Sequence, residues 1–321
     1  MSAAPASQVA VVVPVRDEAG NVAALLDDLR AQEPPAGDVV VVDAGSKDGT
    51  AAIVEDFAAR WPALRLVVRP GATPGAGRNA GVRATGAAVV ATLDAGSRVQ
   101  PGWLAALTGP VRRDPRTVTV GVAVADAHST FERAAAWFTL RAFKRPGEPG
   151  PVGSSFLPAG RNGLCFARSA WEKAGGYPDD LPWGEDKRFV QALRSAGLEM
   201  HVVPSAEVRW RPRTTPAALY RQYERYGRGD ARARIDRQNE LVPLALLGCG
   251  ALLAVRRLRG DRRSGALLAA GATGYLGIFT AAAARDLDWR AAAWIPAIRL
   301  LVDAAKVHGF VAETLRHRLH P

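Results

Sequence analysis

The sequence predicts an α/β fold, a mostly parallel sheet flanked by helices, with apolar helices following it towards the C-terminal end. Short runs of Val and Leu alternate with stretches of helical spacing over residues 9–94, which is the pattern of strands joined by crossover helices. Beyond Glu240 the composition changes, and uncharged runs of fifteen and twenty residues occur at 241–255 and 265–284. We therefore expect a first domain over residues 1–238 and a C-terminal helical region over residues 239–321.

The strands of the first domain are expected at residues 9–13, 39–42, 64–68 and 87–93, and its helices at 21–30, 50–61, 79–84, 169–174 and 187–196. Pro14, Asp43 and Asp94 each follow one of these strands. Ligands of a parallel sheet bind at the carboxyl ends of its strands, so these three residues mark the expected site. The segment 141–163, rich in Pro, Gly and Ser, is either a loop bordering this site or a plain linker.

The net charge of +11 and the pI of about 10.4 fit an anionic membrane, a phosphorylated substrate, nucleic acid, or an Arg-rich genome without functional meaning. No helix-turn-helix, zinc-finger or RNA-binding motif is recognised, so we expect no nucleic-acid partner. The two cysteines, Cys165 and Cys249, exclude a disulfide framework and a cysteine metal site. Residues 1–8 lack the basic start and long apolar run of a signal peptide, so we expect the first domain to stay in the cytoplasm.

The apolar run at 265–284 is long enough to cross a bilayer. The loop at 256–263 carries five Arg and one Asp, so it should resist translocation and lie against anionic headgroups. A simple two-span hairpin would put this loop outside the cell, whereas a first segment that is re-entrant or lies in the interface avoids that conflict. A third apolar stretch, 291–301, is interrupted by Pro296 and Arg299 and is expected at the interface or packed on the other helices. We expect attachment to the cell membrane, with the first domain on the cytoplasmic face. The alternative is a soluble helical subdomain, because these stretches are rich in Ala and Gly rather than Leu.

Acidic residues with the chemistry to bind a nucleotide or accept a proton stand at three places. Asp43 ends a strand and can accept hydrogen bonds from a base or a ribose. Asp94 can bind a ribose or a divalent ion between two phosphates, or merely shape a turn. Glu185 and Asp186 offer a proton acceptor, or are charges at the start of a helix. Basic residues that fit diphosphate binding recur at residues 77–79, 159–163 and 220–229.

In order and spacing these motifs resemble those of a family 2 glycosyltransferase with a GT-A fold, over residues 8–235. Residues 11–21 (Val-Val-Val-Pro-Val-Arg-Asp-Glu-Ala-Gly-Asn) are similar to the family's opening strand and nucleotide-binding loop, and residues 41–50 (Val-Val-Asp-Ala-Gly-Ser-Lys-Asp-Gly-Thr) to its second strand and turn. The resemblance implies inverting transfer of a sugar from a nucleotide-diphosphate sugar to an acceptor hydroxyl. A UDP-sugar is the favoured donor and GDP- or dTDP-sugars are possible, while a lipid-linked or membrane-bound acceptor is expected.

By this resemblance Asp43 contacts the nucleobase, and residues 94–96 occupy the place of the family's Asp-x-Asp metal motif. Gly96 replaces the second acid, so Asp94 is the one protein carboxylate expected to bind Mg²⁺ or Mn²⁺. Residues 184–186 look like the family's Glu-Asp motif, which makes Asp186 the catalytic base, with Glu185 beside it. Residues 222–226 are similar to the Gln-x-x-Arg-Trp motif of processive members, with Tyr in place of Trp.

The resemblance assigns further residues to the two substrates. The expected donor-binding residues are Pro14, Arg16, Glu18, Asp43, Arg78, Asp94, Gln222, Arg225 and Arg228. The expected acceptor-side residues are Arg161, Asn162 and Trp183.

The turn after the first strand does not favour two other classes of nucleotide-binding protein. A nucleotidyltransferase or a Rossmann dehydrogenase would need a Gly-rich turn after the first strand, and residues 13–18 do not supply it. A non-catalytic membrane partner that binds a nucleotide sugar with the same fold remains the alternative, because Gly96 removes a metal-binding carboxylate.

Overall fold

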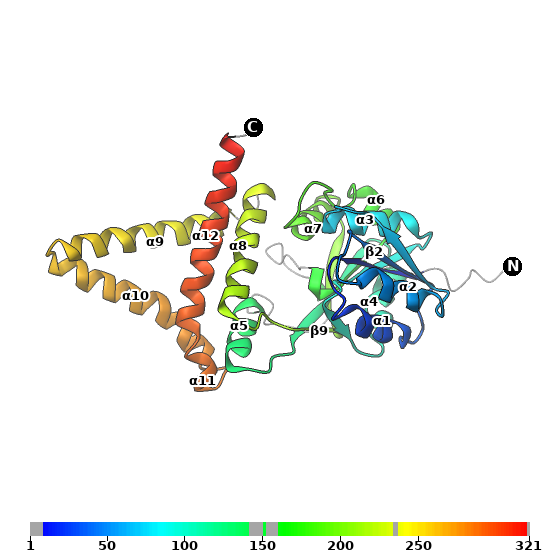
Figure 1. Ribbon diagram of the computed structural model, residues 1–321, viewed down its shortest axis with the longest axis horizontal. Helices are drawn as coiled ribbons and strands as arrows, with labels where there is room; N and C mark the ends of the chain where they lie inside the picture. The colour runs from blue at the N-terminus through cyan, green and yellow to red at the C-terminus, as the bar shows by residue number, and fades with distance from the viewer. Residues whose placement is uncertain (1–8, 141–149, 152–159, 234–236, 320–321) are drawn as a thin grey trace. The chain divides into compact units, whose positions relative to one another are not determined.

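The computed structural model describes residues 9–140, 150–151, 160–233 and 237–319. The chain forms two compact units, which are labelled by element in Figure 1. Unit 1 consists of residues 1–126 and 142–211, and unit 2 of residues 127–141 and 212–321. The chain therefore passes between the units three times.

Unit 1 is built on a sheet that has nine strands in the described part of the chain. They are β1 (Val9–Val15), β2 (Asp38–Asp43), β3 (Leu64–Val68), β4 (Val89–Thr92), β5 (Ser97–Val99), β6 (Thr117–Ala125), β7 (Gly150–Pro151), β8 (Leu164–Ala167) and β9 (Glu199–Trp210). Their order is β3-β2-β1-β4-β8-β6-β9-β5, with β7 beside β9. The pairs along β3-β2-β1-β4 and the pair β6-β9 are parallel, whereas β8, β5 and β7 run antiparallel to their neighbours. The predicted α/β class is confirmed.

Helices cover both faces of this sheet. They are α1 (Val22–Arg30), α2 (Thr50–Ala58), α3 (Pro74–Ala84), α4 (Trp103–Arg113), α6 (Arg168–Lys173) and α7 (Glu185–Ser195), with a short 3-10 helix, η3, at Gly160–Asn162. Figure 1 shows α3, α6 and α7 on one face and α1, α2 and α4 on the other. Because β1 and β2 lie between these layers, their Val residues are almost completely buried.

Helix α3 begins earlier than the predicted helix at 79–84. The Thr73 hydroxyl caps it by accepting a hydrogen bond from the Ala76 N–H at 3.1 Å, and Pro74 occupies its first turn. The prediction missed this turn because it holds Gly75 and Gly77, which disfavour a helix in an isolated sequence.

Unit 2 is helical in its described residues. It contains α5 (Thr130–Leu140), α8 (Pro216–Ala233), α9 (Arg237–Leu258), α10 (Arg262–Ala283), α11 (Trp289–Ala292) and α12 (Ile295–Leu319). Its core joins α5, α8 and α12 through Phe131, Trp137, Leu219, Tyr223, Ile295 and Ile298. Helices α8 and α12 cross closely, because a Cβ on Gly227 would meet the backbone of Lys306 and a Cβ on Gly309 would meet that of Glu224.

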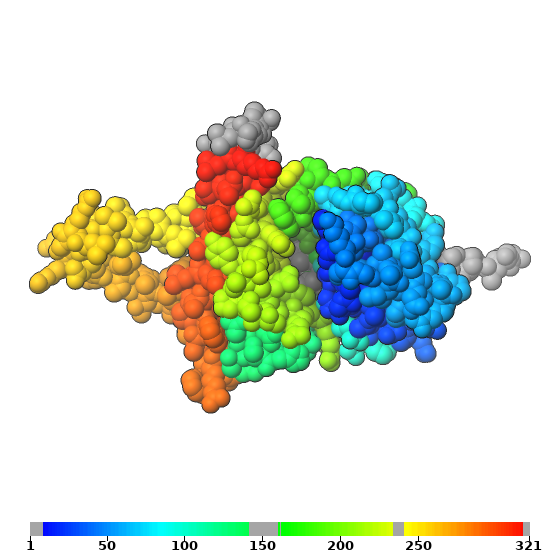
Figure 2. Space-filling view, in the orientation of Figure 1, coloured from blue at the N-terminus to red at the C-terminus, as the bar shows by residue number. Residues whose placement is uncertain are grey.

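Helices α9 and α10 form a hairpin that stands away from α8 and α12 (Figure 2). Residues 241–258 and 262–283 are long and apolar enough to cross a membrane, and only 6% of each stretch is buried inside the protein. Leu252, Leu267 and Ile278 are at least 60% exposed. The third apolar stretch, predicted at 291–301, packs on the other helices through Ile295 and Ile298.

Candidate active site

An arginine between two carboxylates forms the centre of the predicted site. The guanidinium of Arg78, on α3, donates to Glu185 Oε1 at 2.7 Å and to Asp94 Oδ1 at 2.5 Å. Arg78 is 3% exposed, and the side chain of Asp94 is 42% exposed. Burial alone would lower the pKa of Arg78, but Asp94 and Glu185 raise it above its ordinary value. Arg78 is therefore a permanent cation that holds Asp94 at the end of β4.

Glu185, the first residue of α7, is buried beneath this centre. Burial and then the neighbouring Asp186 raise the pKa of Glu185 from 4.5 to about 7, against the opposite effect of Arg78. Its carboxylate is paired with Arg78. The geometry makes Glu185 a support for Arg78, while Asp186 is more open to solvent.

Asp186 is held by backbone hydrogen bonds at the start of α7. Its Oδ2 accepts from the Gly160 N–H at 2.9 Å and its Oδ1 from the Lys187 N–H at 2.8 Å. The positive end of the α7 dipole also favours a carboxylate at this place. Each carboxylate oxygen has a second lone pair, so Asp186 can still accept a proton from a substrate hydroxyl.

Gly160 connects the two sides of the site. A Cβ at this residue would lie 2.5 Å from Arg78 Nη2 and 2.7 Å from Asp94 Oδ1, so any larger residue would push the Arg78–Asp94 pair out of its present position. Its N–H meanwhile binds Asp186. Glycine therefore lets η3 lie against both the Arg78–Asp94 pair and the predicted base without displacing that pair.

Tyr177 packs over the same arginine. Its ring centroid is 5.4 Å from the Arg78 guanidinium carbon and 3.9 Å from the ring of Phe189 in α7, on which it stacks. The amide of Asn79 donates to the Tyr177 carbonyl at 2.7 Å and to Asp179 Oδ1 at 2.6 Å. These contacts fix α7, and so Glu185 and Asp186, against α3.

The raised pKa of Glu185 leads to a test by pH. Because the pKa is higher in the folded state than the ordinary 4.5, Glu185 contributes stability that is complete below pH 4.5 and is lost as the pH rises through about 7. We expect wild type to lose thermal stability relative to Glu185→Gln over this window, measured by tryptophan fluorescence in detergent. Glu55→Gln, at an exposed site on α2, is the control. A Glu185→Gln difference that stays constant from pH 4.5 to 8 would contradict the assignment.

The predicted donor residues on β1 and β2 lie in two connected loops. Asp43, 2% exposed at the end of β2, accepts from the Ser46 hydroxyl at 2.5 Å and the Ser46 N–H at 3.1 Å. The loop after β1 is tied to the loop after β2, because the Glu18 N–H donates to the Thr50 hydroxyl at 2.8 Å. Arg16 is exposed beside Asp17.

Pro14 and Glu18 extend these loops towards α3 and β4. A Cβ on Gly77 would lie 3.3 Å from Pro14 Cβ, so the proline packs on the helix that carries Arg78. Glu18 Oε2 accepts from Asn21 at 2.7 Å and lies 4.0 Å from where a Cβ on Gly96 would be. The loops after β1, β2 and β4 thus lie at the same end of the sheet.

The structure describes only part of the predicted acceptor-side residues. Asn162 is 1% exposed and donates to the Gly121 carbonyl at 3.3 Å, while its Oδ1 has no hydrogen-bond partner within the described ranges. Trp183 is half-buried two residues before Glu185. The side chain of Arg161 lies outside the described ones. All three stay predictions as acceptor ligands.

Gln222, Arg225 and Arg228 belong to α8 of unit 2. Gln222 is 7% exposed and bonds Tyr226 at 2.8 Å and Arg213 at 3.0 Å. Arg225 is exposed, and Arg228 donates to Glu224 at 2.5 Å. Gln222 and Arg228 are thus bonded to residues of unit 2, and the predicted contacts of all three with the donor stay predictions.

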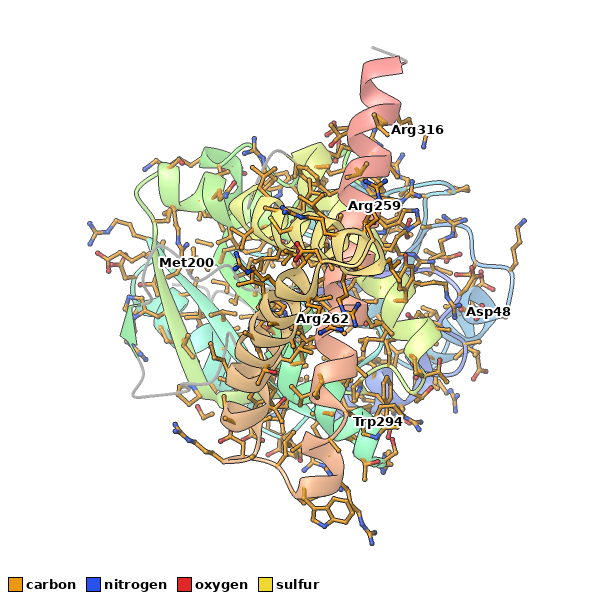
Figure 3. All side chains as sticks on the ribbon, turned by 90° about the vertical axis from the view of Figure 1, so that its left-hand side faces the viewer. Asp48, Met200, Arg259, Arg262, Trp294 and Arg316 are labelled. Carbon is orange, nitrogen blue, oxygen red and sulfur yellow. The ribbon has the colours of Figure 1, made fainter. Side chains whose placement is uncertain are left out.

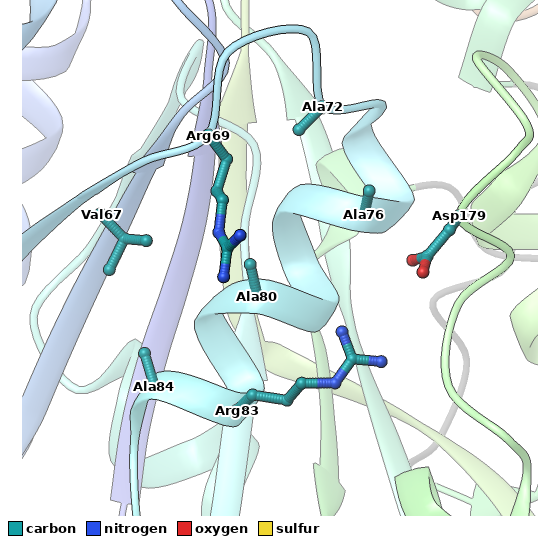
Figure 4. A pocket seen from close by; sticks show the side chains of 8 residues that line it. All are labelled: Val67, Arg69, Ala72, Ala76, Ala80, Arg83, Ala84 and Asp179. Carbon is teal, nitrogen blue, oxygen red and sulfur yellow. The ribbon is translucent and has the colours of Figure 1, made fainter.

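A separate pocket of about 390 Å³ lies on the side of α3 away from Arg78 (Figure 4). It is lined by Val67, Arg69, Ala72, Ala76, Ala80, Arg83, Ala84 and Asp179. None of the residues predicted for the site lines it.

The residues of this site could hold a divalent ion only if a bound nucleotide sugar added further ligands. Among the described residues no group of three or more His, Cys, Asp or Glu side chains could hold a metal by itself. Asp94 supplies one carboxylate, and one of its oxygens already accepts from Arg78. Mg²⁺ commonly keeps several waters and is held by one or two carboxylates plus substrate phosphates, so a bound diphosphate and water would supply the ligands beyond Asp94.

Sequence reasoning missed Gly160 and Tyr177 as parts of this site. Their only local signals were a glycine in Ala-Gly-Arg-Asn-Gly and an aromatic residue in a Gly-Gly-Tyr-Pro turn. Neither pattern shows that the residue will contact Arg78, about eighty to a hundred positions away.

Two family models match the chain. Glycosyl transferase family 2 covers residues 10–163, and Glycosyl transferase family group 2 covers residues 89–294. Succinoglycan biosynthesis protein ExoA of Rhizobium meliloti is 26% identical over 257 residues, which are 76% of this chain and 78% of that protein. The pre-mycofactocin glycosyltransferase of Mycobacterium tuberculosis is 28% identical over 254 residues, 77% of this chain, and the chain spans about half of that protein's length (51%).

A solved structure shares the fold. Mannosyltransferase PcManGT from Pyrobaculum calidifontis, in complex with GDP-Man and Mn²⁺, matches with a TM-score of 0.67 at 21% identity, covering 95% of this chain and 86% of that one. This likeness confirms the predicted GT-A type of sheet. Since the family group 2 model alone covers more than half of the chain, the protein belongs to the family 2 glycosyltransferases and is an enzyme that uses a nucleotide sugar.

Proposed function

We propose that this enzyme transfers a sugar, with inversion, from a nucleotide-diphosphate sugar to a hydroxyl of a membrane-bound or lipid-linked acceptor. The observation that carries the proposal is the arrangement of Asp186 and Asp94 about Gly160 and Arg78. It provides a proton acceptor and a fixed cation within one small region of unit 1. A UDP-sugar is the first candidate donor, with GDP- and dTDP-sugars as the alternatives.

The proposed reaction is a single displacement. Asp186 takes the proton of the acceptor hydroxyl, whose oxygen forms a bond to the anomeric carbon as the bond from that carbon to the diphosphate oxygen breaks. The nucleoside diphosphate leaves with the bonding electron pair. Arg78 offers a cation near the phosphates and positions Asp94, and a bound divalent ion would neutralise part of the diphosphate charge. Attack from the opposite face inverts the anomeric centre.

Turnover tests this function directly. Full-length enzyme in detergent is mixed with UDP-, GDP- and dTDP-sugars and a lipid extract, and release of nucleoside diphosphate and of glycosylated lipid is measured. We expect one donor to give both products. Nucleotide-sugar binding without any product would favour the non-catalytic membrane partner suggested by Gly96.

Metal binding should depend on the nucleotide. We expect Mg²⁺ or Mn²⁺ to bind weakly to the free enzyme and more tightly once a nucleoside diphosphate adds oxygen ligands, measured by titration calorimetry. Gly96→Asp is the matched variant, because there is space beyond this residue and the change restores a second carboxylate. It should tighten metal binding without nucleotide. Tight binding to the free wild-type enzyme would contradict the proposal.

We propose that residues 239–321 attach the enzyme to the cell membrane, with unit 1 on the cytoplasmic face. The support is the hairpin of α9 and α10, whose two apolar stretches are almost wholly uncovered. Its turn carries the five-Arg loop, which should resist translocation, so with unit 1 on the cytoplasmic face the first apolar segment is re-entrant or lies in the interface and keeps these arginines beside anionic headgroups. The hairpin buries its apolar surface in lipid rather than in the protein.

Cys249 on α9 is a native reporter of this attachment. It is exposed in the protein, whereas Cys165 is buried and burial raises the pKa of its thiol, so Cys165 reacts slowly. We expect a water-soluble maleimide to leave Cys249 unmodified in intact membranes and to modify it after unfolding in detergent. Cys165→Ser removes the background signal. Complete labelling in intact membranes would show that the hairpin is not embedded.

A further inference from the structure

Helix α12 has one side buried in unit 2. Ile298, Val302 and Ala305 lie in the core shared with α8 and α5, and Gly309 lies against the α8 backbone. Further along, Glu313 is 3% exposed and pairs with Arg228 of α8 at 3.7 Å. This side is therefore fixed on α8 along most of the helix.

The opposite side of α12 is apolar and uncovered. We call it the α12 stripe, and it consists of Ala297, Leu300, Ala304, Val307, Val311 and Leu315. The spacing of three or four residues places them on one side of a helix with 3.6 residues per turn. Leu300 is 45% exposed and Leu315 is 52% exposed, while the two alanines are exposed and the two valines are half-buried. His308, at the edge of the stripe, bonds Tyr220 of α8 at 3.0 Å.

Polar and aromatic residues mark the two ends of the stripe. Arg316 follows it at one end, and Trp294 lies at the other, as Figure 3 shows. Near Trp294, Trp289 is 76% exposed and lies under the guanidinium of Arg290, at 5.4 Å. Trp and Arg at the ends of an apolar helix face are typical of the water boundary of a membrane.

The direction of the hairpin indicates that a membrane covers the α12 stripe. Figures 1 and 3 show it leaving α12 on the side away from α8, with Arg259 and Arg262 at its far end. The long axis of α12 runs across the direction of the hairpin. If the hairpin enters a bilayer, α12 is brought to the surface of that bilayer with its uncovered side towards it.

We propose that α12 lies in the plane of the membrane surface, with the α12 stripe turned into the acyl chains and Arg290 and Arg316 among the headgroups. The proposal rests on the membrane attachment proposed above. It adds a second, in-plane contact, which sets the orientation of unit 2 on the membrane. Helix α8, on the other side of α12, then faces the cytoplasm.

Depth-dependent quenching tests the in-plane contact. The two native cysteines of the full-length enzyme are first removed by Cys165→Ser and Cys249→Ser. A single cysteine is then introduced either in the stripe, as Ala304→Cys, or on the exposed side of α8, as Arg221→Cys. This cysteine is labelled with an environment-sensitive dye. The protein is placed in vesicles of phosphatidylcholine and phosphatidylglycerol that contain brominated lipid. We expect quenching about threefold or more stronger at residue 304, because an interfacial helix buries its apolar face roughly 5–10 Å deep.

Each outcome has a defined meaning. Val311→Cys repeats the measurement about two turns away on the same stripe, so that misfolding of one variant does not decide the result. If the native Cys249 is shielded by lipid but residues 304 and 311 are not quenched, the in-plane contact is wrong and the attachment stands. If Cys249 is also unshielded, the attachment itself fails. Disulfide formation between cysteines 304 of two copies in the vesicles would overturn the proposal in favour of a dimer contact.

Discussion

Asp186→Asn should lower sugar transfer by about a hundredfold or more while leaving nucleotide-sugar affinity nearly unchanged. The amide oxygen of Asn can still accept the hydrogen bond from the Gly160 N–H, and only the bond from the Lys187 N–H of the adjacent residue is lost, so the fold around α7 is kept. What is lost is the ability to accept a proton from the acceptor. Single-turnover rates and equilibrium binding of the donor measure the two quantities separately.

Asp180→Asn is the matched control for this change. Asp180 lies in the turn before α7 and is exposed. We expect its transfer rate to stay close to that of wild type. If Asp186→Asn also turned over within a few-fold of wild type, Asp186 would not be the base.

Arg78→Met should destabilise unit 1 strongly and abolish donor binding. The change leaves Glu185, which is 6% exposed, without its charged partner. Removing one member of a buried ion pair typically costs about 3–5 kcal/mol, because the other charge stays buried. Urea unfolding in detergent should show this loss, and the loss should be smaller at low pH, where Glu185 is protonated.

Two further variants separate charge from packing. Arg83→Met removes an exposed arginine from the same helix, one that lies 5.6 Å from the ring centre of Trp171, and should cost about 1 kcal/mol or less. Arg78→Met combined with Glu185→Gln removes the stranded charge and should recover much of the stability but not the donor binding. An Arg78→Met enzyme as stable as Arg83→Met would refute the role given to the buried pair.

Local sequence patterns were sufficient for the parallel half of the sheet. The predicted strand at 39–42 falls inside β2, whose Val residues are buried, because a run of Val covered on both faces has a strong signal. The strand at 64–68 matches β3, an edge strand that its β-branched and Leu residues indicate although it is partly exposed. The antiparallel half was not assigned. Residues 117–125 alternate in a way typical of a strand, yet β6 is placed by pairing with β8 and β9 rather than by its own pattern.

The site was predictable in its residues but not in its contacts. Motifs indicated Arg78, Asp94, Glu185 and Asp186 one by one. The pairing of Arg78 with Glu185 joins residues 107 positions apart, and the pKa of Glu185 is raised by its burial and by Asp186 once α7 is folded against α3. This ion pair and this pKa arise only when α3 and α7 pack against each other in the folded protein.

The order of the chain through the two units has a practical consequence for dissecting the enzyme. Helix α5 precedes the last third of unit 1 in the chain but buries Phe131 and Trp137 in the core of unit 2. A fragment ending at residue 211 would therefore carry α5 without its partners, and one ending after α8 would leave Leu219 and Tyr223 uncovered. No single cleavage releases either unit whole. Variants for crystallisation are better sought by replacing exposed leucines of the hairpin than by truncation.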